Sequence, residues 1–207
     1  MEIYLFDFDD TLFVTQSKIY VISPTSGKIE KSFTTDEYRT HHETIQFYMS
    51  NGYNIDYSET AKKKSLQTAV PNKKYKHFLR NLARKGKTLG ILTSRGVHPI
   101  YIQRCVSKHF KIKIPLENII CVHHEQTYKR ICQRVKLHDY RFTPSENRKK
   151  NGLAYFIGKG YHVIHFFDDD DTNIRTGLEI QRECRERHFS TQIFTYLVRH
   201  SKTNIHK

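Results

Sequence analysis

Two dense clusters of acidic residues follow apolar runs near opposite ends of this 207-residue chain. The run MEIYLF leads into Asp7 and Asp9, and the run HFF leads into four aspartates that begin at Asp168. Carboxylates crowded into one place repel one another and take up protons unless a cation compensates their charge. Mg²⁺ is a hard cation that prefers oxygen ligands, so the clusters predict a magnesium site with a phosphoryl group beside it.

The first cluster has a spacing that suits phosphoryl transfer. Asp7 and Asp9 are two residues apart, and a turn after a strand can aim both side chains into one crevice. One carboxylate can attack phosphorus and form an acyl phosphate, while the other gives a proton to the leaving oxygen and later takes one from water. The hydroxyl of Thr11 completes the pattern DxDxT and is a candidate substrate contact, whereas Asp10 is expected to be a turn residue.

Strand-like and helix-like segments alternate along most of the chain, and this alternation predicts the fold that must position the carboxylates. It implies right-handed crossovers and an α/β fold, with a Rossmann-like parallel sheet and helices on both faces. Ligands of such sheets bind beyond the carboxyl ends of the strands, where both acidic clusters fall. The predicted strands cover residues 2–6, 88–93, 117–122, 161–167 and 191–198, and the predicted helices cover 71–86, 98–110, 127–137, 145–160 and 172–187.

Residues 13–70 depart from this alternation. The pieces KIYVIS and KIEKSF flank PTSG, in which Pro24 and Gly27 favour a hairpin turn. The following residues, 34–69, are polar and irregular, with a short helix expected at the cap-like sequence TTDE. We therefore expect a small β-hairpin followed by irregular structure.

The stretch FDFDDTLF resembles the first motif of phosphatases of the haloacid dehalogenase superfamily. The resemblance implies that Asp7 is the nucleophile, that Asp9 is the general acid/base, and that the Asp7 side chain and the Asp9 backbone carbonyl bind Mg²⁺. LGILTSR fits the second motif, in which Thr93 would hold a phosphoryl oxygen with Ser94 beside it. Arg95 resembles a substrate-site arginine in the phosphatase half of phage polynucleotide kinases.

Two later motifs follow in the order that the resemblance implies. A catalytic lysine is expected at the start of the helix before the last motif; Lys149 and Lys150 both qualify, and Lys149 has the better spacing. HFFDDDDTNI resembles the DDxxxN form of the final acidic motif. By this alignment Asp169 is the magnesium ligand, Asn173 is in the supporting position and Asp168 is an outer or alternative ligand. Four consecutive acids leave this register open by one residue.

In this superfamily, an insert after the first motif is a cap that screens the cleft and selects the substrate. The resemblance therefore implies a core of residues 1–12 and 71–207 and a cap of residues 13–70. The predicted hairpin and the T-x-x-E-Y segment after it also resemble uncharacterised viral and phage members. A cap this small is expected to leave the cleft open, which favours large substrates.

The net charge of +14 indicates a polyanionic partner. Thirty-five Lys and Arg outnumber 21 Asp and Glu, and such a field attracts nucleic acids, nucleotides or anionic membranes. Basic runs occur at residues 62–64, 73–76 and 108–113, where lysines could follow phosphates and interleaved Tyr and Phe could stack on bases. A solvated basic surface is the alternative interpretation of these runs.

Together these features predict a Mg²⁺-dependent phosphohydrolase that acts through an aspartyl phosphate, with a phosphorylated nucleic-acid end, most plausibly a 3′-phosphate, as its substrate. One alternative is the same chemistry on free nucleotides or other small phosphoesters. Another is a nucleic-acid-binding protein that keeps this scaffold without catalysis.

The chain has no feature of a membrane or secreted protein. No stretch approaches the roughly 20 apolar residues of a membrane helix, and MEIYLF lacks the basic lead-in of a signal peptide. We expect an intracellular protein, cytoplasmic or nuclear, whose four cysteines are reduced and which has no membrane partner. The sequence leaves the oligomeric state open.

Overall fold

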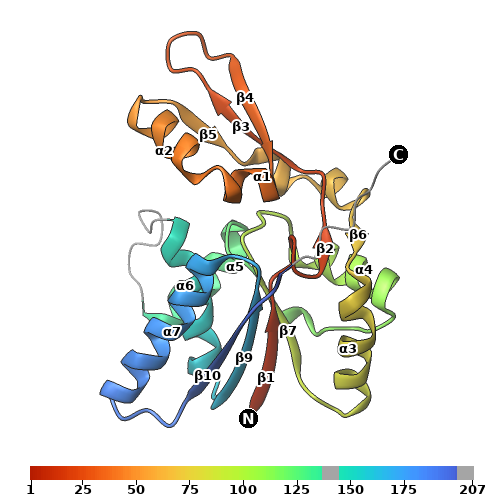
Figure 1. Cartoon of the computed structure of the whole chain (residues 1–207). Coiled ribbons are helices and arrows are strands. Elements are labelled where there is room, and N and C mark those ends of the chain that lie inside the picture. Colours follow the sequence, from red (N-terminus) through yellow and green to blue (C-terminus); the bar gives the residue numbers. More distant parts are fainter. Residues whose placement is uncertain (137–144, 200–207) are drawn as a thin grey trace.

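The computed structural model describes residues 1–136 and 145–199, and its central element is a five-stranded sheet (Figure 1). Every neighbouring pair of strands in this sheet is parallel. The predicted α/β fold with a Rossmann-like parallel sheet is therefore confirmed. The strand order is β10 (Gln192–Leu197), β9 (Val163–Asp168), β1 (Glu2–Phe6), β7 (Leu89–Thr93) and β8 (Ile119–Cys121).

Helices cover both faces of the sheet because its inner strands are apolar on both sides (Figure 1). Phe6 and Ile91 pack against helices on one face, and Leu5 and Leu92 pack against helices on the other. Strands buried on both faces are typical of parallel sheets. The first face carries α3 (Lys73–Arg84) and α4 (Pro99–Phe110), and the second carries α5 (Glu125–Val135), α6 (Ser145–Gly158) and α7 (Asp171–Glu186).

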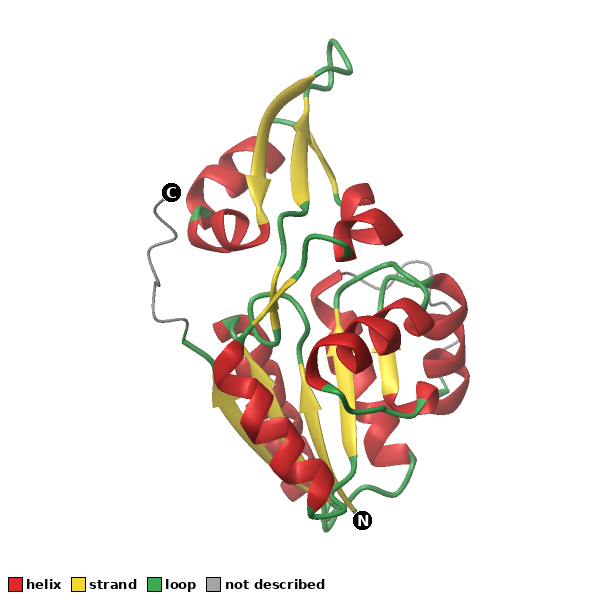
Figure 2. Cartoon of the chain, turned by 90° about the vertical axis from the view of Figure 1, so that its right-hand side faces the viewer, coloured by secondary structure: helices red, strands yellow, loops and turns green. Residues whose placement is uncertain are grey.

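Residues 13–70, called the insert below, carry a separate three-stranded antiparallel sheet in the order β4-β3-β5 (Figure 2). The predicted hairpin is confirmed as β3 (Lys18–Ile22) and β4 (Ile29–Thr34), with Gly27 in its turn at a φ of 64°. The sequence did not predict β5 (Asn54–Asp56), which pairs with the other edge of β3. The insert lies beyond the carboxyl ends of the parallel strands (Figure 1).

Two helices and two short 3₁₀ turns complete the insert. The predicted helix is confirmed as α1 (Thr35–Thr40), whose N-cap Thr34 and third residue Glu37 form a reciprocal capping box. The second helix, α2 (His42–Ser50), was not predicted and buries Ile45 in the small core of the insert. The turns are η1 (Ser58–Ala61) and η2 (Lys63–Leu66).

The insert leaves and re-enters the core through two adjacent strands. β2 (Phe13–Val14) pairs antiparallel with β6 (Val70–Pro71), and the backbone N–H of Asn72 donates to the carbonyl of Leu12 (2.8 Å). The chain therefore leaves the core and returns to it at one place. Residues 137–144 and 200–207 of the predicted core lie outside the described residues.

The helix after the insert begins later than the sequence predicts. Pro71 lies in β6, and Asn72 is the N-cap of α3. The side-chain oxygen of Asn72 accepts a hydrogen bond from the backbone N–H of Lys74 (3.2 Å). An N-cap side chain satisfies a donor of the first turn that has no partner within the helix, and the proline ring cannot do so; the helix therefore starts at Lys73.

The four cysteines are free and buried. Among residues 1–136 and 145–199, no helix combines the length and the apolar character needed to span a membrane.

Candidate active site

The two acidic clusters meet where the chain changes direction in the sheet. From β1 the chain passes outward to β7 and β8, and it later fills the opposite side with β9 and β10. Ligands of open parallel sheets bind at the carboxyl edge beside such a reversal. Asp7 directly follows β1 and Asp168 ends the adjacent strand β9, so both lie at this edge.

Three carboxylates converge at this edge. Asp7, Asp168 and Asp169 each place one ligand oxygen within 4.8 Å of the others. Asp7 and Asp168 are buried, and Asp169 is partly buried. Oxygen donors at this separation, from ends of the chain about 160 residues apart, could hold one divalent cation.

Lys149 lies between two of these carboxylates. Its Nζ donates to Asp7 Oδ1 (2.7 Å) and to Asp168 Oδ2 (2.8 Å), and the side chain is buried. Burial alone would lower the pKa of Lys149, but the carboxylates of Asp168 and Asp7 outweigh burial and raise it. The ammonium group therefore stays charged and offsets part of the negative charge.

The structure separates the two candidate lysines. The Nζ of Lys150 donates to Glu183 Oε1 on α7 (2.7 Å), away from the three carboxylates. Successive residues of a helix point about 100° apart, so only one of two neighbouring lysines can enter the site. The prediction of a catalytic lysine at Lys150 is thereby corrected, and Lys149 is the lysine at the carboxylates.

The carboxylates are too crowded for all of them to be charged at no cost. Burial is the main reason that the pKa of Asp7 lies well above its usual value; Lys149 opposes this rise and Asp168 adds to it. Burial also raises the pKa of Asp169 to about 7, with Asp168 adding to the shift and Arg39 opposing it. A bound cation would lower the cost of keeping these buried carboxylates charged.

Asp168 is held by donors from its own end of the chain. Its Oδ1 accepts from the side-chain amide of Asn173 and from the backbone N–H of Asp170, both at 3.0 Å. Its Oδ2 accepts from Lys149. Asn173 thus supports a carboxylate through its N–H group, and Asp168 has fewer free lone pairs than Asp169 for a metal.

Asp9 faces an arginine, and its carboxylate is not one of the three that converge. Arg95 Nε donates to Asp9 Oδ2 (2.8 Å) and Arg95 Nη2 donates to Asp9 Oδ1 (2.7 Å), a two-pronged ion pair. Thr15 also donates to Asp9 Oδ1 (2.7 Å). The predicted role of Asp9 as a metal ligand therefore depends on its backbone carbonyl alone.

Arg95 also ties the core to the insert. Its side chain is only 1% exposed, and its guanidinium lies over the Phe8 ring. The predicted contact of Arg95 with substrate would require breaking the bonds that it already makes. Besides Asp9, its acceptors are Thr60 O (3.2 Å), Ser65 Oγ (2.7 Å), Thr15 Oγ1 (3.0 Å) and Ser17 Oγ (3.0 Å).

The predicted hydroxyl residues lie at the same edge of the sheet. Thr93 ends β7, the strand paired with β1, and is fully buried. Thr11 donates its hydroxyl to Asp169 Oδ1 (3.1 Å), which places it against a candidate metal ligand. Ser94 follows Thr93 and is exposed.

Arg39, a residue of the insert that reaches the site, was not predicted from the sequence. Its Nη1 donates to Asp169 Oδ2 (2.6 Å) and to the Asp169 backbone carbonyl (2.5 Å), while Nη2 pairs with Asp36 (2.6 Å). Nearby, Thr35 donates to Asp10 Oδ2 (2.7 Å); Asp10 is in a turn, as predicted, with a φ of 55°. Helix α1 therefore contacts both acidic clusters.

Comparison with known proteins adds no assignment to this geometry. No protein-family model matches the chain. Neither the curated proteins nor the solved structures give a significant match.

Proposed function

We propose that the chain is a Mg²⁺-dependent phosphohydrolase of the haloacid dehalogenase type, acting through an aspartyl phosphate. The observation that carries the proposal is the convergence of Asp7, Asp168 and Asp169 around Lys149 at the reversal point of the sheet. A nucleophile, a fixed cation and a set of oxygen ligands are the parts that this reaction needs in one place.

The reaction is proposed to run in two displacements. A carboxylate oxygen of Asp7 attacks phosphorus, the bond to the leaving oxygen breaks, and Asp9 gives that oxygen a proton. Water then attacks the same phosphorus while Asp9 takes a proton back, which releases inorganic phosphate and restores Asp7. Thr93 and Lys149 supply donors for the phosphoryl oxygens and for Asp7.

The three carboxylates fit a hard divalent ion because their donors are all oxygens and their charge exceeds that of Lys149. Asp7 and Asp169 would hold Mg²⁺ by their side chains, with Asp168 kept in place by Asn173. When bound, Mg²⁺ offsets the carboxylate charge and neutralises charge that develops on the phosphoryl group.

Proton transfer by Asp9 requires a rearrangement of its surroundings. Both oxygens of Asp9 accept from Arg95, so neither is free to give a proton to a leaving group. Asp9 must therefore move off Arg95 when substrate binds. Arg95 is a positioning residue in this proposal, because it holds the acid/base between reactions.

The proposed substrate is a phosphorylated nucleic-acid end. The support is the net charge of +14 and the exposed basic runs, since a field of this sign concentrates polyanions. The alternatives are free nucleotides or other small phosphoesters, and nucleic-acid binding without catalysis.

The first experiment measures hydrolysis of p-nitrophenyl phosphate with and without Mg²⁺. We expect metal-dependent turnover, and we expect Asp7→Asn to reduce kcat by several orders of magnitude while the circular dichroism spectrum is unchanged. Radiolabelled phosphate should stay on the acid-quenched wild-type chain and be missing from the variant. Activity of the Asp7→Asn protein would show that Asp7 is not the nucleophile. Inactivity of the wild type on every phosphoester would favour a nucleic-acid-binding protein without catalysis.

A substrate panel tests the second half of the proposal. It compares kcat/KM for a 3′-phosphorylated oligonucleotide with the values for mononucleotides, sugar phosphates and phosphopeptides. A preference for the oligonucleotide is expected. Equal or better turnover of mononucleotides would assign the enzyme to small phosphoesters instead.

A further inference from the structure

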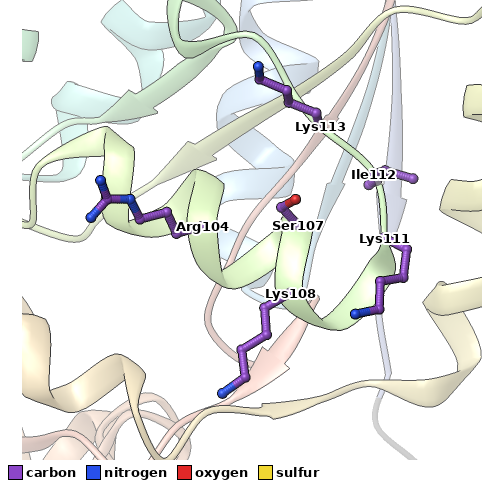
Figure 3. Close-up of a pocket in the computed structure, with 6 residues that line it drawn as sticks. All are labelled: Arg104, Ser107, Lys108, Lys111, Ile112 and Lys113. Carbon is purple, nitrogen blue, oxygen red and sulfur yellow. The ribbon is translucent and has the colours of Figure 1, made fainter.

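A basic hollow lies beside the C-terminal half of α4, and the candidate active site makes no use of it (Figure 3). Its volume is about 590 Å³. Four of its six lining side chains are cations, and no carboxylate lines it. The lining residues are Arg104, Ser107, Lys108, Lys111, Ile112 and Lys113.

The positive charge of this hollow is not compensated by the described protein. None of its four cations forms an ion pair with a carboxylate of residues 1–136 or 145–199. Other surface lysines do find such partners: Lys87 pairs with Glu2, and Lys150 pairs with Glu183. All four cations of the hollow are exposed and therefore accessible to a ligand.

The backbone around the hollow is fixed in place. Lys111 ends α4 in a left-handed conformation (φ 58°), with its N–H bonded to the Ser107 carbonyl, and this turns the chain back along the helix. Gln103 Nε2 donates to the carbonyl of the buried Ile114 (2.7 Å) and fastens the returning segment to α4. Figure 3 shows the cations of helix and returning segment arranged around Ser107.

The helix dipole does not account for this arrangement. Cations in the last turn or at the C-cap of a helix stabilise its negative end, which explains Lys108 and Lys111. Arg104 lies before the last turn, and Lys113 lies beyond the end of the helix. The four charges therefore form a surface whose common feature is affinity for anions.

The lining selects among anions. The predicted base stacking within residues 108–113 is wrong for Phe110, because this ring is fully buried. With no aromatic side chain in the lining, the hollow offers mainly cations to phosphates and no aromatic ring to the faces of bases. Such contacts are independent of base sequence and give binding its dependence on salt.

The hollow is also connected to the candidate active site. Helix α4 packs against η2, whose Ser65 accepts from Arg95 of the Asp9 ion pair. The neighbouring Lys63 places its Nζ over the Tyr101 ring of α4 (5.2 Å). The exposed Lys63 thus lies against the helix that carries the hollow, and phosphates could follow it and the exposed Lys62 and Lys64.

We propose that the basic hollow binds the phosphodiester backbone of a nucleic acid several nucleotides away from the end held in the active site. The proposal rests on the proposed function for the position of that end, and it deepens that function by giving the remainder of the substrate a location. Binding itself needs no catalysis and can be measured apart from it.

The test measures binding of a fluorescently labelled single-stranded oligonucleotide without terminal phosphate, by anisotropy over a series of salt concentrations. Removing two phosphate contacts with Lys108→Ala/Lys113→Ala should weaken binding. It should also make the slope of log affinity against log salt less steep by about 1.4, or about 0.7 for each lost contact. Arg185→Ala/Arg187→Ala, two exposed arginines at the end of α7 on the opposite face of the sheet, removes the same charge as a control.

An unchanged affinity and slope in the α4 variant would overturn the proposal. Equal losses in both variants would also overturn it, because the effect would then come from net charge alone. Binding to phosphatidylserine vesicles with no binding to the oligonucleotide would assign the hollow to a membrane surface. Hydrolysis of p-nitrophenyl phosphate by the wild type separates the two proposals, because that small substrate does not reach the hollow.

Discussion

The two sides of the candidate active site differ in what holds their carboxylates in place. On the core side, Asp7 and Asp168 share the ammonium group of Lys149. All three residues belong to the parallel sheet and its helices, and all three are buried. This side therefore depends only on the packing of the core.

On the insert side, the carboxylates are held by arginines that join the core to the insert. Arg95 belongs to the core and binds Asp9 together with backbone and hydroxyl groups of the insert. Arg39 belongs to the insert and binds Asp169 of the core. A displacement of the insert would change the partners of both aspartates.

The difference suggests a division of roles within one site. Asp7, the proposed nucleophile, is held by the core, and in the proposed reaction a shift of an ångström would be costly. Asp9, the proposed acid/base, and Asp169, a proposed metal ligand, are contacted by side chains of the insert, so a shift of the insert would change their surroundings.

On the core side, Lys149→Met removes the ammonium group that Asp7 and Asp168 share and leaves two buried carboxylates without their cation. The free energy of unfolding of the metal-free protein should fall by about 3–5 kcal/mol in urea denaturation. Lys150→Met is the matched control; it removes a partly exposed pair and should cost at most about 1 kcal/mol. Equal losses in the two variants would show that Lys149 is not a buried counter-ion.

On the insert side, Arg95→Ala removes the buried ion pair with Asp9 and the hydrogen bonds of Arg95 to the insert. Unfolding should become easier by about 3 kcal/mol, and trypsin should cleave faster at the exposed lysines 62–64, because the insert is less firmly held. Arg95→Lys should restore little, since an ammonium group cannot reproduce the two-pronged pairing. An unchanged cleavage rate would show that Arg95 does not hold the insert in place.

The response to pH tests whether a metal replaces protons at the carboxylates. The folded-state pKa of Asp169 is about 7, above its usual value, so this group destabilises the metal-free fold progressively as pH rises towards 7. Mg²⁺ should therefore raise Tm more above pH about 8 than below pH about 6, where protons compete with it. Differential scanning fluorimetry measures the shift, and a Mg²⁺ effect that is independent of pH would contradict a site built from these carboxylates.

The smallest effect is expected for Arg39→Ala, which removes a partner of Asp169, a proposed metal ligand. In the proposed metal site Arg39 and Mg²⁺ would compete for Asp169. A partly exposed ion pair is worth up to about 1 kcal/mol, so removing Arg39 should tighten Mg²⁺ binding by about two- to fivefold in calorimetric titration. Lys28→Ala, at the far turn of the insert, is the control for net charge. Weaker Mg²⁺ binding in Arg39→Ala would make Arg39 a support of the metal site.

Local patterns accounted for the core of the fold and for one side of the site. The apolar runs before Asp7 and Asp168 predicted two strands, and their alternation with helices predicted that both strands end at the same edge. The resemblance to a family motif also favoured Lys149, the lysine that meets the carboxylates. These features depend on residues close together in the chain, which the sequence displays directly.

The features that the sequence did not reveal depend on distant partners. β5 has only three residues, NID, and these show no strand pattern in the sequence. It forms a strand because it pairs with one edge of β3. Arg39 was one of 35 basic residues, with nothing local to connect it with Asp169, 130 positions away. Arg95 was noticed for its motif, but its burial under the insert was not visible in that motif.

The order of residues thus established which groups are available at the edge of the sheet: aspartates after strands, two neighbouring lysines on one helix, and an excess of positive charge. Folding in three dimensions established which cation meets which carboxylate. Ion pairs form between side chains that packing brings within about 3 Å, and the approach of the insert to the core is not encoded in any short stretch. The core side could therefore be foreseen, and the insert side required the structure.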